Sequence, residues 1–97
     1  MILQDEKTNI NIDRMKDSDG RIIRWPKKMA EKQAVLEYLL TKFEKGRDYT
    51  EMEVNKIIKE WHSFGDHPLL RRELIDSRLM SRTQDCKRYW LEGNHKQ

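Results

Sequence analysis

The chain has 97 residues, enough for one domain, and 38% of them are charged while only 36% are hydrophobic. This composition predicts a small core under a heavily charged surface. It excludes a membrane-spanning helix, because no apolar run approaches the roughly 20 residues that a bilayer requires. The formal net charge of +3 excludes neither nucleic acids nor proteins as partners. Cys86 is the single cysteine and has no partner for an internal disulfide, so we expect a cytoplasmic protein without a signal peptide.

Residues 1–20 are polar, contain the stretch DSDG and show no sustained helical or strand periodicity. We expect a flexible N-terminal tail that ends in a turn at Asp19 and Gly20. The stretch RIIRW that follows is β-branched at its centre and is stopped by Pro26, which cannot donate a ladder hydrogen bond. It predicts a short strand or an extended packing segment. A single domain is expected over residues 21–93, with residues 94–97 as a C-terminal tail.

The first helix is expected over residues 27–44. Its apolar residues recur at the spacing of one helical face, with two more nearby: Leu36, Leu39, Leu40 and Phe43, then Met29 and Val35. Lys45 and Gly46 follow, a base and the residue best suited to a left-handed C-terminal cap. The pattern therefore predicts a helix that buries one side and ends just before Gly46.

The second helix has the clearest start signal in the chain. Thr50 can cap it, and Glu53, three residues later, completes a capping box. Tyr49 and Val54 occupy the two positions of a hydrophobic staple, and Tyr49 also stands where a winged helix places its first short strand. The helix is expected to end within the stretch HSFGDHP. Its apolar face consists of Val54, Ile57, Ile58 and Trp61.

The third helix is expected to begin within residues 66–68, where Asp or His can cap and Pro tolerates the first turn, and to run to about Ser77. LMSRT and CKRYWL then predict two strands of a ribbon, anchored in the core by Leu79, Tyr89 and Trp90. The order of helix, single strand residue, helix, helix, strand and strand is that of a winged helix. The expected fold class is α+β, with three helices, a small antiparallel β-ribbon wing and an extra N-terminal extended segment.

Residues 20–91 carry three characteristic stretches: RWPKK, VLEYLLTKFEKGRDYTEMEVNKIIKEWH and LLRRELIDSRLMSR, the last followed by YW. Together they resemble a bacterial family known as domain of unknown function 2087. The resemblance implies a winged-helix-like fold and an association with transcriptional regulation, because family members stand alone or behind a helix-turn-helix domain of the arsenical-resistance-repressor type. It implies no established reaction and no established ligand.

Position by position, the resemblance places the family's arginine pair, its two acids and its asparagine on Arg71, Arg72, Glu73, Asp76 and Asn55. One departure is Arg78, which stands where the family usually has glycine. If this position is left-handed, a side chain there costs on the order of 1 kcal/mol. The wing tip TQDCK also lacks a glycine that is often found there.

Positive charge is concentrated on the third helix and the ribbon, because six bases outnumber three acids between residues 67 and 90. In the functional interpretation, the helix enters the major groove of DNA and the wing touches phosphate. Arginine suits both tasks, since its planar fork can form two hydrogen bonds with guanine or with phosphate. The candidate nucleic-acid-binding residues are Arg71, Arg72, Arg78, Arg82, Lys87 and Arg88.

The alternative interpretation of these arginines is structural. Arg72 stands four residues before Asp76 and could pair with it on the helix, and either arginine of the pair could bond the acidic second helix. Glu73 would repel phosphate if it faced DNA. The third helix also lacks the amide and hydroxyl side chains that enrich a base-reading surface.

Other chemistry has little support in the sequence. The soft metal ligands do not have the spacing of a metal site: His62, His67, His95 and Cys86. No catalytic nucleophile with a base and no glycine-rich phosphate loop is present, so we expect no enzyme, no cofactor and no small-molecule substrate. Trp25, Trp61 and Trp90 could stack on single-stranded bases, but packing is the favoured interpretation. Asn55 is expected to have a structural role.

Two functions remain open at this stage. The first is a DNA-binding, transcription-regulatory winged-helix module on double-stranded DNA. The second is a winged-helix module for protein–protein interaction in a regulatory complex, in which the third helix packs against a partner or a second copy and the arginines form ion pairs. No membrane partner is expected. A homodimer is possible, although the sequence has no long apolar heptad to supply a dimer helix.

Overall fold

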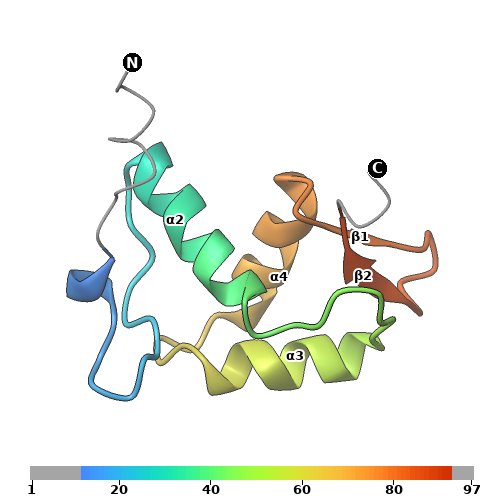
Figure 1. Cartoon of the computed structure of the whole chain (residues 1–97), viewed down its shortest axis with the longest axis horizontal. Coiled ribbons are helices and arrows are strands. Elements are labelled where there is room, and N and C mark those ends of the chain that lie inside the picture. Colours follow the sequence, from blue (N-terminus) through green and yellow to red (C-terminus); the bar gives the residue numbers. More distant parts are fainter. Residues whose placement is uncertain (1–11, 93–97) are drawn as a thin grey trace.

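The computed structural model describes residues 12–92. These residues form the 3₁₀ helix η1 (Asp13–Met15), the helices α2 (Met29–Leu40), α3 (Glu51–Glu60) and α4 (His67–Asp76), and the strands β1 (Met80–Arg82) and β2 (Tyr89–Leu91). Figure 1 shows η1 and the β-ribbon at opposite ends of the long axis, with the three helices between them. The α+β class of three helices and an antiparallel ribbon is confirmed, and the arrangement is consistent with a winged helix.

The ribbon is a short pair of antiparallel strands with one additional β-bridge. Met80 lies opposite Leu91, and Arg82 lies opposite Tyr89. Tyr49 adds a bridge on the other side of β2, because its N–H and carbonyl each bond the backbone of Tyr89 at 2.8 Å. The strand residue expected just before the second helix is therefore confirmed. Of the three expected anchors Tyr89 is buried, whereas Leu79 and Trp90 are only half-buried.

Two helices begin at the caps that the sequence predicts. The Thr50 hydroxyl accepts a hydrogen bond from the Glu53 N–H at 3.1 Å, and the Glu53 carboxylate accepts one from the Thr50 N–H at 2.9 Å. The Asp66 carboxylate likewise accepts a hydrogen bond from the Leu69 N–H at 3.2 Å, one residue after Pro68. Both bonds satisfy backbone donors that a helix start leaves without a partner.

The first helix is shorter than its apolar pattern suggests. It ends at Leu40, where the backbone changes to the tighter 3₁₀ pattern and the N–H of Thr41 bonds the Tyr38 carbonyl at 3.0 Å, while the Thr41 hydroxyl bonds the same carbonyl at 2.6 Å. The N–H of Lys42 likewise bonds the Leu39 carbonyl. Gly46 has the expected left-handed φ of +76°, but it lies in the following turn rather than at the helix cap. Met29, expected near the apolar face, is 77% exposed.

The expected tail through residue 20 is too long. Met15 is 2% exposed and belongs to the core, and its carbonyl accepts a hydrogen bond from the Ile23 N–H at 2.8 Å. Ile22 is fully buried, donates to the Trp61 carbonyl and accepts from the Ser63 N–H. Residues 12–23 are thus an arm packed on the helices, and RIIRW is an extended packing segment. Residues 1–11 and the expected C-terminal tail lie outside the described residues.

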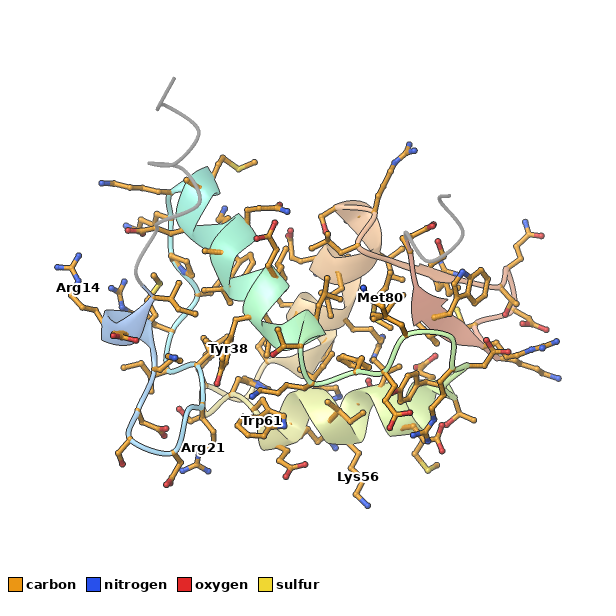
Figure 2. All side chains as sticks on the ribbon, viewed as in Figure 1. Arg14, Arg21, Tyr38, Lys56, Trp61 and Met80 are labelled. Carbon is orange, nitrogen blue, oxygen red and sulfur yellow. The ribbon has the colours of Figure 1, made fainter. Side chains whose placement is uncertain are left out.

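Aromatic side chains hold the arm in place. The Tyr38 hydroxyl donates to the Gly20 carbonyl at 2.7 Å, and Gly20 has a left-handed φ of +84°. The Lys42 ammonium lies 3.8 Å from the centre of the Trp61 ring. Figure 2 shows Tyr38 reaching from α2 toward Trp61. Trp61 is therefore half-buried in a structural cluster, and Trp25 also packs against the core. Over residues 12–92, the helices are too short or too polar to cross a membrane.

Candidate nucleic-acid interface

Two adjoining hollows lie between α4 and the ribbon. Together they form one surface, the α4–wing groove, because Ile75 and Arg82 line both of them. The first has a volume of about 390 Å³ and is lined by Glu51, Arg71, Arg72, Ile75, Asp76, Arg82, Cys86 and Tyr89. The second has a volume of about 510 Å³ and is lined by Ile75, Arg78, Met80, Ser81, Arg82, Gln84 and Glu92. Four of the six predicted binding residues line this groove.

Arg71 is turned toward α3 rather than toward solvent. Its guanidinium donates a hydrogen bond to the side-chain oxygen of Asn55 and lies 3.7 Å from the carboxylate of Glu51. Its side chain is only 24% exposed. The two buried leucines of α4, Leu70 and Leu74, direct that face of the helix into the core and bring Arg71 alongside α3. Arg71 therefore bonds the second helix, as its structural interpretation describes, and Asn55 has the structural contact expected of it.

Glu51 is the residue of this cluster that sequence reasoning did not single out. It stands four residues before Asn55, so both side chains lie on the same face of α3. The sequence signal for this pairing is an acid and an amide at this spacing, followed by an arginine on the next helix. The signal is weak, because the sequence alone does not state which face of α3 meets α4.

Arg72 and Arg78 are exposed. Within residues 12–92 neither forms an ion pair, and the expected pair between Arg72 and Asp76 is absent. Arg72 lies in the middle of α4, and Arg78 lies in the turn between α4 and β1. Their guanidinium donors therefore stay available to an anion from outside the chain.

The wing cations differ from one another in their bonding. Arg82 donates from one nitrogen to the carbonyls of Thr83 and Gln84 at 3.1 and 3.5 Å and to the Cys86 sulfur at 3.2 Å, all of which are neutral groups. Lys87 is exposed. Arg88 instead lies 3.4 Å from the carboxylate of Asp48, in the loop before α3. Arg88 is thus the wing cation whose charge is already partly balanced.

The wing tip is built without glycine. Cys86 adopts a left-handed φ of +64° there, which side chains rarely do. The Thr83 hydroxyl stabilises the turn by donating to the Asp85 carboxylate at 2.7 Å and accepting the backbone N–H of Lys87 and of Arg88. The Asp85 carboxylate also accepts the backbone N–H of Lys87 at 3.0 Å. The bond from Thr83, and next this bond from Lys87, lower the pKa of Asp85 below its ordinary value. A charged Asp85 thus helps to close the wing.

Arg78 provides the first prediction at this site. Its φ of +67° shows that this position is left-handed, the condition under which a side chain has a cost. We expect Arg78→Gly to raise the free energy of unfolding by about 0.5–1 kcal/mol, because the relief of backbone strain exceeds the entropy that glycine adds to the unfolded chain. Arg78→Ala is the matched control, since it removes the same charge but keeps Cβ. Equal stabilities of the two variants in urea denaturation would contradict the prediction.

Tyr89 provides a second prediction, on pH. Burial, and next the negative charge of Glu51, raise the pKa of Tyr89 to about 12. Its hydroxyl donates to Glu51 at 3.3 Å. Because the unfolded chain releases this proton near pH 10 and the folded chain holds it, stability should fall as the pH rises from about 10 to about 12. Between about pH 9 and pH 11, the free energy of unfolding of Tyr89→Phe, measured by urea denaturation, should fall by about 1 kcal/mol less than that of the wild type. Identical pH profiles would refute this.

The histidines have structural surroundings. His62 is buried, its Nδ1 lies 2.6 Å from the Ile58 carbonyl, and its Nε2 accepts the Asp66 N–H at 3.0 Å, so both ring nitrogens are occupied. Burial, with Lys59 and Arg71 nearby, lowers the pKa of His67. No group of three or more metal-binding side chains occurs within residues 12–92, and His95 lies outside them.

A sequence model of one bacterial family matches residues 21–91, from the extended arm to the last strand. The chain belongs to this family. Its description reads uncharacterized protein conserved in bacteria, domain of unknown function 2087. The family's region thus spans all three helices, both strands and every residue that lines the α4–wing groove except Glu92, but not η1. No curated protein and no solved structure shows significant similarity to the chain.

Proposed function

We propose that this chain is a cytoplasmic DNA-binding module of transcriptional regulation that holds double-stranded DNA against the α4–wing groove. One observation carries the proposal: most of the cations on α4, the turn after it and the wing have no carboxylate partner within residues 12–92. Within residues 12–92, Arg72, Arg78 and Lys87 form no ion pair, and Arg82 bonds only neutral groups. Such cations can meet phosphate oxygens without first breaking an ion pair. Arg71 and Arg88 take no principal part, because both face acids.

The salt dependence of DNA binding tests this proposal. Each phosphate contact contributes about −0.9 to the slope of log affinity against log salt, so four cations predict a loss of roughly 100-fold between about 50 and about 200 mM salt. Fluorescence anisotropy with a labelled random duplex measures it. We expect Arg72→Ala to weaken binding about 5- to 10-fold and to reduce the slope by about 1.

Arg14→Ala is the matched control for this test. Arg14 is an exposed arginine on η1, and Figure 2 shows it at the end of the molecule opposite the ribbon. The substitution makes the same change in net charge at a distant place, so it should leave affinity and slope nearly unchanged. Equal losses in the two variants would mean that the whole-chain charge, not the α4–wing groove, binds DNA. No binding by the wild type at low salt would reject the proposal.

A second candidate function is a protein-interaction module in a regulatory complex. It is favoured by Glu51 and Asp76, whose side chains line the same hollow as Arg72. A surface of mixed charge suits a protein partner or a second copy better than it suits a uniformly negative duplex. The same titration separates the two functions, because this module would not bind DNA even at low salt. Sedimentation velocity of the chain alone would then show whether the partner is a second copy.

A further inference from the structure

Sequence-specific DNA binding needs side chains that reach base edges, mostly amides, hydroxyls and arginine forks. Around α4, the amide oxygen and the hydroxyl group that could contact a base already form hydrogen bonds within the protein. The side-chain oxygen of Asn55 accepts a hydrogen bond from Arg71. The Ser77 hydroxyl donates to the Leu74 carbonyl at 3.3 Å. Asn55 therefore cannot use its oxygen and its NH2 group together on one base, and Ser77 cannot donate to a base, without the loss of an existing bond.

The ribbon has the same property. The Ser81 hydroxyl donates to the carboxylate of Glu92, and the Thr83 hydroxyl holds the wing turn through Asp85. Gln84 is the exception: its side chain is exposed on the groove and forms no hydrogen bond within residues 12–92. One amide at the wing tip is too little to specify a site, since each bidentate base contact contributes only about 1–3 kcal/mol of discrimination.

The available arginines are placed for phosphate. Of Arg72, Arg78 and Arg82, only Arg72 lies on α4, the helix that would enter the major groove. Arg78 lies on the turn after α4, and Arg82 lies on β1. Cations that are spread over a helix, a turn and a strand suit contacts with a charged nucleic-acid backbone better than contacts with the edge of one base pair.

We propose that the α4–wing groove binds the phosphate backbone of duplex DNA without regard to base sequence. This inference rests on the proposed DNA-binding function and specifies its ligand as any duplex. Lysine also binds phosphate, as a point charge, whereas two-bond contacts to guanine are better suited to the planar fork of arginine. Lysine should therefore replace arginine at position 72 with little loss of affinity. The Asp76 carboxylate can accept a hydrogen bond from cytosine, and the Ile75 side chain can contact the thymine methyl group. The test therefore compares duplexes of different base composition.

Competition experiments test the inference with the full chain and a labelled random duplex at low salt. Unlabelled duplexes of random, A·T-rich and G·C-rich sequence should compete with affinities within about 3-fold of one another. Arg72→Lys should bind within about 3-fold of the wild type, whereas Arg72→Ala should bind about 5- to 10-fold more weakly. Gln84→Ala is the control for base reading at the wing and should leave this ranking unchanged.

The outcomes separate this inference from the function on which it rests. A preference of more than about 10-fold for one competitor, or Arg72→Lys binding as weakly as Arg72→Ala, would overturn sequence independence while the DNA-binding function stands. No binding of any duplex by the wild type would overturn both. Equal competition together with rescue by lysine would support the inference.

Discussion

Truncation of Ile22 to alanine is expected to lower the free energy of unfolding by about 3 kcal/mol. Ile22 is 0% exposed, and its backbone bonds the Trp61 carbonyl at 2.8 Å and the Ser63 N–H at 2.9 Å. The truncation leaves a cavity beneath a segment that these two bonds hold in place. In a chain of this length the loss should lower the thermal midpoint by roughly 12–24 °C, which calorimetry and urea denaturation can measure.

The neighbouring residue supplies the control for this prediction. Ile23 is the same residue type, but it is 41% exposed. Ile23→Ala should therefore cost only about 1 kcal/mol, since a large part of its surface stays in water in the folded state as well. Similar losses in the two variants would mean that the arm does not pack as described.

Arg71→Ala is expected to lower the free energy of unfolding by about 1.5–3 kcal/mol while the folded protein keeps its affinity for DNA and its salt slope. The guanidinium bonds Asn55 and faces Glu51 in a half-buried place, and hydrogen bonds to charged groups contribute about this much. Arg72→Ala should have the reverse result, with an unchanged midpoint and weaker DNA binding. A loss of DNA affinity in Arg71→Ala at a temperature where it is fully folded would contradict this assignment.

A double-mutant cycle shows whether the bond to Asn55 is the cause. If it is, the costs of Arg71→Ala and Asn55→Ala should not add, and the double variant should be about 1 kcal/mol more stable than the sum predicts. Exact additivity would assign the cost of Arg71→Ala to lost packing of its alkyl chain instead.

Local signals were sufficient at the starts of the second and third helices, where the interacting groups are close in sequence. The capping box joins residues only three apart, and the left-handed position of Arg78 depends on its own backbone. The end of α2 was missed although it is also local. The apolar pattern continues to Phe43, but from Thr41 on the backbone N–H groups bond the carbonyls three residues back instead of four. A periodic pattern reports which face is buried, not where the hydrogen bonds stop.

The candidate site required knowledge of contacts distant in sequence. Arg71 and Arg72 are adjacent, and both arginines look equally fit to meet DNA. They point about 100° apart around α4, and only the packing of α3 against α4 makes one of them structural. Asp48, which pairs with Arg88 across 40 positions, shows the same limitation.

By itself, the sequence determined the order of the helices and strands, the two capped helix starts and the α+β class, because periodicity and caps act within one or two turns of chain. Only the tertiary structure decided that residues 12–23 belong to the folded unit and that Arg71 faces inward, whereas Arg72 stays available to a ligand. Both outcomes depend on which surfaces meet when helices pack, and that choice is made by the whole core rather than by any local stretch.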